Sequence, residues 1–149
     1  MGVRVGKGEK KTMARKNKLA VKRKLKNVTQ DLAALNRELA SQMVLLASQT
    51  GDTAPLIQAV KALRQAEDIY TLQSMPEDNL EVQKALGDTL LTLGRAQNDI
   101  DALCSAAESY RAAITLASMV GDHKLRRTLK RSLAHAENLR LNLLGLQAA

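Results

Sequence analysis

Apolar residues recur at spacings of three and four along the chain from about residue 29 onward, which is the spacing of one face of an α-helix. Residues that are typical of turns interrupt this pattern at four places: Gly51-Asp52, Met75-Pro76-Glu77-Asp78, Asn98-Asp99 and Gly121-Asp122. The pattern predicts helices over about 29–49, 53–74, 77–95, 99–121 and 122–144. Since Ala, Leu, Lys, Arg, Gln and Glu dominate the composition, we expect an all-α fold.

The apolar pattern repeats after 47 residues. At this shift Leu39-Ala40 aligns with Leu86-Gly87, Leu56 with Leu103, and Leu63 with Tyr110. A hairpin of two helices cannot bury its apolar face alone, so repeated hairpins are expected to stack on one another. The sequence therefore predicts antiparallel helical hairpins at about 29–74 (repeat 1) and about 77–120 (repeat 2), followed by a capping helix at about 122–145.

The second repeat contains Leu86-Gly87-x-x-Leu90 and then Ala106-x-x-x-Tyr110-x-x-Ala113. This arrangement resembles the tetratricopeptide repeat, in which Leu-Gly opens the first helix and Ala-x-x-x-aromatic-x-x-Ala packs the second. The resemblance implies a short right-handed solenoid whose concave groove holds a peptide or a helix of a partner protein. The period of 47 residues is longer than the usual 34, so HEAT and armadillo repeats are the alternative helical solenoids.

Three cations share one position of the repeat: Arg37, Lys84 and Arg131 each lie two residues before a Leu. If the first helices of the units stack in parallel, these side chains form a column. The face that carries this column resembles the concave groove of tetratricopeptide proteins, in which basic residues bind the carboxylates of a partner. We expect a partner-binding groove made of this column and the neighbouring row, namely Arg37, Ser41, Lys84, Asp88, Arg131 and His135. The alternative is that these are ordinary solvent-facing positions.

The net charge of +8 is unevenly distributed. Residues 1–26 carry a net charge of +10, residues 27–122 carry −7, and residues 123–149 carry +5. We expect residues 1–26 to be a flexible basic tail, or a helix from about residue 17, that contacts anionic partners. Its contact residues would be Lys10, Lys11, Arg15, Lys16, Lys22, Arg23 and Lys24.

This charge supports an alternative function, nonspecific binding of DNA or RNA through the tail and the basic last helix. That helix carries Lys124, Arg126, Arg127, Lys130, Arg131 and Arg140. The tail contains no aromatic residue that could stack on bases, which argues against sequence-specific recognition.

A further apolar stripe overlaps the tail at the a/d spacing of a coiled coil. Two interpretations fit it: a homodimer seam, or the core stripe of a helix that packs on its neighbour in the same chain. The stripe consists of Val21, Leu25, Val28, Leu32, Leu35, Leu39 and Leu46.

No pattern in the sequence favours catalysis. His123 and His135 are twelve residues apart, which is not a metal-ligand spacing on one helix face, and Cys104 aligns with the apolar Ile57. No Gly-rich phosphate loop, secretory signal or membrane-spanning segment is expected. We therefore expect a cytoplasmic, non-enzymatic adaptor without a metal or cofactor, which binds a protein or peptide, the groove favouring an acidic one.

Overall fold

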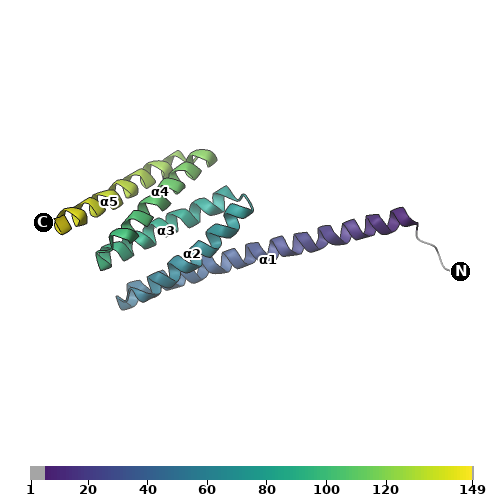
Figure 1. Ribbon diagram of the computed structural model, residues 1–149, viewed down its shortest axis with the longest axis horizontal. Helices are drawn as coiled ribbons and strands as arrows, with labels where there is room; N and C mark the ends of the chain where they lie inside the picture. The colour runs from purple at the N-terminus through teal and green to yellow at the C-terminus, as the bar shows by residue number, and fades with distance from the viewer. Residues whose placement is uncertain (1–5, 149) are drawn as a thin grey trace.

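A computed structural model describes residues 6–148 and confirms the all-α prediction. Its five helices are α1 (Lys7–Thr50), α2 (Ala54–Leu72), α3 (Pro76–Gln97), α4 (Ile100–Val120) and α5 (His123–Ala148). Within the described range no residue lies in a strand. Each helix packs against the next along the chain and runs antiparallel to it (Figure 1).

The turns after α1 and α3 share two features 47 residues apart, a left-handed residue at the helix end and an Asp after it. Gly51 ends α1 with a φ of 73°, and Asn98 ends α3 with a φ of 50°, both in the left-handed region that stops a helix. Asp52 and Asp99 then accept hydrogen bonds from the first backbone N–H groups of the next helix, at 3.0 Å and 3.2 Å. The Gly or Asn at the end of one helix and the Asp before the next therefore determine where these helices end and begin.

Both hairpins pack small residues of their first helix against large residues of their second. In α3 and α4 the contact is close at Gly94, where a Cβ would lie 2.7 Å from Cδ2 of Leu103, and closer still at Gly87, where a Cβ would lie 2.5 Å from Cε1 of Tyr110. The buried positions match at the predicted shift: Ala40 and Ala47 with Gly87 and Gly94, Leu56 and Leu63 with Leu103 and Tyr110, and Ala59 and Ala66 with Ala106 and Ala113. The repeat seen in the sequence is thus a repeat of packing.

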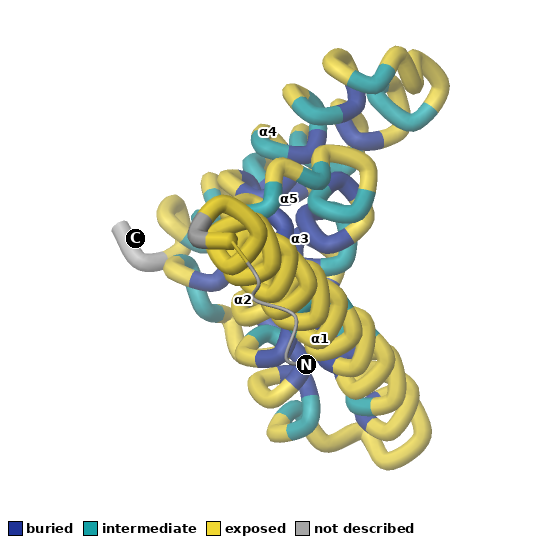
Figure 2. Tube along the Cα trace, turned by 90° about the vertical axis from the view of Figure 1, so that its right-hand side faces the viewer, coloured by how far each residue is buried: buried dark blue, intermediate teal, exposed yellow. Residues whose placement is uncertain are grey.

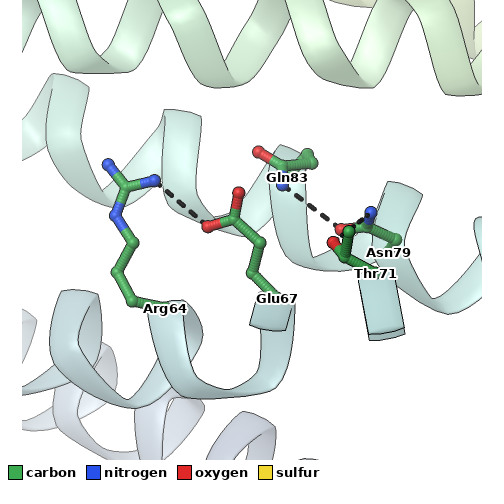
Figure 3. Close-up of polar contacts among 5 residues, drawn as sticks. All are labelled: Arg64, Glu67, Thr71, Asn79 and Gln83. Atoms are coloured by element: carbon green, nitrogen blue, oxygen red, sulfur yellow. Dashed lines mark hydrogen bonds and ion pairs between the residues drawn. The ribbon is translucent and has the colours of Figure 1, made fainter. Parts of the chain in front are cut away.

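Polar side chains accompany the apolar contacts where the two hairpins meet, between α2 and α3. The Nε2 of Gln83 donates to Oδ1 of Asn79 at 3.2 Å, and Nδ2 of Asn79 donates to Oγ1 of Thr71 at 3.3 Å. Figure 3 shows these two hydrogen bonds beside the ion pair between Arg64 and Glu67 of α2, whose nearest atoms are 3.1 Å apart. Since Gln83 is buried, these bonds satisfy polar groups that the junction removes from water.

Helix α1 begins at Lys7, ten residues before the earliest helix start considered from the sequence. Residues 8–28 are exposed throughout, and this part of the helix projects beyond the hairpins as a rod (Figures 1 and 2). Over residues 7–26 the basic segment is therefore a helix, because Lys, Arg and Ala have high helix propensity even without a packed face. The part of the expected tail at residues 1–5 lies outside the described residues.

Candidate partner-binding groove

A cavity of about 540 Å³ lies between α1 and α3, with α2 beneath it. Its apolar part includes Ala40 of α1, Leu63 of α2 and Val82 of α3. These residues belong to the core, so helix packing holds this surface in place. The other lining residues are Ala34, Arg37, Glu38, Ser41 and Val44 of α1, and Glu81, Ala85, Asp88 and Thr89 of α3.

Half of the predicted groove residues line this cavity. Arg37, Ser41 and Asp88 do so, whereas the other three do not. Arg131 and His135 lie on α5, which packs mainly on α4, and both are exposed. The stacking of α5 on α4 therefore separates its polar row from the space between α1 and α3. The sixth residue, Lys84, is half-buried on α3 outside the lining.

The guanidinium of Arg37 is already engaged by other residues of the chain. Its Nη1 donates to Oδ1 of Asp78 at 3.2 Å, which connects α1 to the first turn of α3. The same guanidinium lies 5.8 Å from the ring centre of Tyr70, within the range of a cation–π contact. Arg37 therefore joins the two hairpins at one end of the cavity, and its charge is partly neutralised before any partner binds.

Asp88 is fixed at the rim of the cavity by a residue from α4. The Oη of Tyr110 donates to Oδ1 of Asp88 at 2.7 Å, and the tyrosine is fully buried. Burial raises the pKa of Tyr110 far above its ordinary value of 10.0, and the hydrogen bond to Asp88 raises it further. The phenol consequently stays protonated and keeps the carboxylate oriented.

The charge of the cavity lining differs from the basic column that the sequence suggested. Three carboxylates line it (Glu38, Glu81 and Asp88), against the single cation Arg37. Sequence reasoning missed Glu38 and Glu81. A signal for the second was present, because Glu81, Ala85 and Asp88 follow the i, i+4, i+7 spacing of one helix face.

The predicted anionic-contact residues all lie on the projecting part of α1, away from the cavity, and every one of them is exposed. In the described part of the chain, no helix is long and apolar enough to cross a membrane. No cluster of three or more His, Cys, Asp or Glu side chains suited to a metal ion occurs among those residues either.

Comparisons with protein-family models, with curated proteins and with solved structures find no match for this chain. The resemblance to tetratricopeptide repeats therefore depends on the residues of the second hairpin and on the repeated packing.

Proposed function

We propose that this protein is a non-enzymatic adaptor that holds a segment of a partner protein in the cavity between α1 and α3. The observation that carries the proposal is the cavity itself, which combines an apolar surface from three helices with a polar rim. Such a combination is typical of binding sites, since apolar burial supplies affinity and the rim fixes orientation. With two hairpins flanking it, the cavity is short, and it suits a few residues or one helix of a partner.

The rim favours a partner that carries Lys or Arg. Glu38, Glu81 and Asp88 supply three negative charges, while Arg37 is held by Asp78. A cation placed between these carboxylates gains charge-assisted hydrogen bonds, and a carboxylate placed there is repelled. The acidic partner that we expected from the basic column is therefore replaced by a basic one in this proposal.

The stacked hairpins support the finer proposal of a short, right-handed tetratricopeptide-like solenoid. Tyr110 fills the space between the small residues of α3 and the neighbouring elements, as the aromatic of that repeat does. The groove between the first helices of neighbouring hairpins is where such a solenoid binds its partner. The cavity occupies the corresponding place between α1 and α3.

A peptide-display selection on the full chain tests the proposal. We expect enrichment of peptides that combine apolar and basic residues, and at least tenfold weaker binding of those peptides by the variant Glu81→Lys. Glu108→Lys is the matched control, because Glu108 is an exposed acid on α4 outside the cavity lining. Enrichment of acidic peptides, or equal binding by Glu81→Lys and the unaltered chain, would contradict the proposal.

A second candidate function is nonspecific binding of nucleic acid by the projecting part of α1. The observation that favours it is the exposure of all nine Lys and Arg residues from 10 to 26 on one continuous helix. Such a helix would bind by contacts with phosphates, so affinity should fall steeply with salt. The double variant Lys16→Glu/Arg23→Glu should weaken binding to a duplex of arbitrary sequence at least tenfold in a mobility-shift assay and reduce its salt dependence, and unchanged binding would exclude this function.

A further inference from the structure

The first helix carries the apolar residues of an interior helix on a face that is left exposed by the part of the chain that the structure describes. At the 47-residue shift, Leu35 and Leu39 of α1 correspond to Val82 and Leu86 of α3. Val82 and Leu86 are fully buried, whereas Leu35 is 67% exposed and Leu39 is 46% exposed. In α3 this face meets the preceding hairpin. Among residues 6–148, no helix packs on the same face of α1.

The exposed face continues along the rod, well past the part of α1 that corresponds to α3. Val21, Leu25 and Val28 extend it over a region of α1 that makes no buried contact with the rest of the chain. From Val21 to Leu39 the spacing alternates strictly between four and three residues, which averages the 3.5 of a coiled coil. A helix that packs on a globular neighbour needs no such strict heptad, so the pattern favours a second long helix.

We propose that the first six residues of the apolar stripe, Val21, Leu25, Val28, Leu32, Leu35 and Leu39, form the seam of an antiparallel homodimer. The six apolar positions are bracketed by two polar ones, Lys18 before them and Gln42 after them. The pattern therefore matches its own reverse. When two copies of the helix pair in antiparallel fashion about the middle of this pattern, Val21 of one copy faces Leu39 of the other, Leu25 faces Leu35, and Val28 faces Leu32. Each pair occurs twice because the two copies are related by a two-fold axis, which gives six apolar layers. The same register places Lys18 across from Gln42 of the second copy.

Charges beside the stripe favour the antiparallel orientation. In this register Lys24 of one copy lies next to Glu38 of the other, which gives two ion pairs across the seam. The one like-charge contact is between the two Asp31 side chains at the axis. A parallel pair would instead place the basic halves of both helices side by side. It would also stack Leu at all three a positions and Val at two of the three d positions, which is not the arrangement of β-branched residues at a and Leu at d that favours parallel dimers.

The packing of α3 shows that a helix on this face is compatible with the fold. Helix α3 accepts an antiparallel helix, α2, on one face and α4 on another (Figure 1). In α1 the apolar residues buried in the chain's own core are Ala33, Ala40 and Ala47, which lie on a different side of the helix from the stripe. The α1 helix of a second copy would thus take the place that α2 occupies on α3.

The mass of the full chain in solution tests the proposal, by sedimentation velocity at micromolar to tens of micromolar concentrations. We expect a dimer, and at least a 100-fold weaker association for Leu32→Glu, which places two charges among the apolar layers. Leu72→Glu is the matched control, because Leu72 is an exposed leucine outside the stripe, and it should remain dimeric. Circular dichroism should show the same helix content in all three chains. A monomeric full chain, a larger oligomer, or a dimer unaffected by Leu32→Glu would overturn the proposal.

Charge reversal tests the orientation. Lys24→Glu and Glu38→Lys should each weaken the dimer severalfold, and the double variant should restore it, because the pair is re-formed with its signs exchanged. Absence of any restoration would overturn the antiparallel register.

Discussion

The ring of Tyr110 lies directly against the backbone of Gly87, so closely that a Cβ at Gly87 would be 2.5 Å from Cε1 of the tyrosine. The ring is fully buried, and its hydroxyl is hydrogen-bonded to Asp88, so it has little room to move. In the first hairpin the equivalent pair is Ala40 and Leu63, in which a larger first residue meets a smaller second one. The sizes of the two residues are therefore matched within each hairpin.

Replacement of Gly87 by Ala should destabilise the fold. The added methyl group overlaps the Tyr110 ring, which costs about 1–3 kcal/mol by overpacking and outweighs the gain in helix propensity of about 1 kcal/mol. Urea unfolding followed by circular dichroism measures the difference. The control is Gly145→Ala in α5, where a Cβ meets nothing within 4 Å, and we expect it to be neutral or slightly stabilising. If Gly87→Ala were as stable as Gly145→Ala, the close contact would not exist in solution.

The parts of the fold that the sequence predicts are those with local signals. The turn at Gly51-Asp52 and its counterpart at Asn98-Asp99 place helix ends within a residue or two, because the left-handed residue and the Asp that follows it act on neighbouring backbone groups. The start of α1 was not predicted, since residues 7–26 form a helix without an apolar face packed on the chain. Helix propensity alone sets that boundary.

The candidate site was predicted only in part, because its charge depends on contacts between distant residues. Arg37 was expected to attract carboxylates of a partner, but Asp78, forty-one positions later, already neutralises its charge in part. No local signal in the sequence relates these two residues. The repeat register did identify Ser41 and Asp88, because positions that share a register share a helix face.

Removal of the Tyr110 hydroxyl should have an effect that depends on pH. Burial and the bond to Asp88 raise the pKa of Tyr110 above its unfolded value of about 10.0, so the folded chain holds the phenol proton more tightly than the unfolded chain does. The stabilisation from this group is therefore complete below pH 10 and is lost as pH rises above it, by about 1.4 kcal/mol per pH unit. Tyr110→Phe should cost about 1 kcal/mol at pH 8 and equal the unaltered chain near pH 11.

Urea unfolding of both chains at several pH values between 8 and 11 measures this difference. Because Lys residues titrate in both chains over the same range, their effect cancels in the comparison. A difference that stayed constant up to pH 11 would show that the pKa of Tyr110 is not raised by folding.

The ion pair between Arg37 and Asp78 should contribute little to stability by itself. Both side chains are more than a third exposed, at 35% and 40%, so water and salt screen the attraction. A double-mutant cycle with Arg37→Ala and Asp78→Ala should give a coupling energy below about 1 kcal/mol, which falls further at high salt. Arg37→Ala alone should cost more than Asp78→Ala alone, because it also removes the contact with the Tyr70 ring. A coupling energy that is large and independent of salt would contradict this assignment.

The end of α3 can be stabilised at Asn98. This residue has a φ of 50°, a conformation that Gly adopts freely, Asn tolerates and Ala resists. We expect Asn98→Gly to raise the free energy of unfolding by several tenths of a kcal/mol and Asn98→Ala to lower it by about 1 kcal/mol. Gly51→Asn at the equivalent turn is the reciprocal control, and it should destabilise by about as much as Asn98→Gly stabilises. Thermal or urea unfolding of the three variants checks the order. Since Gly and Ala both remove the exposed amide, equal stability of the two variants at position 98 would show that backbone conformation does not decide this helix end.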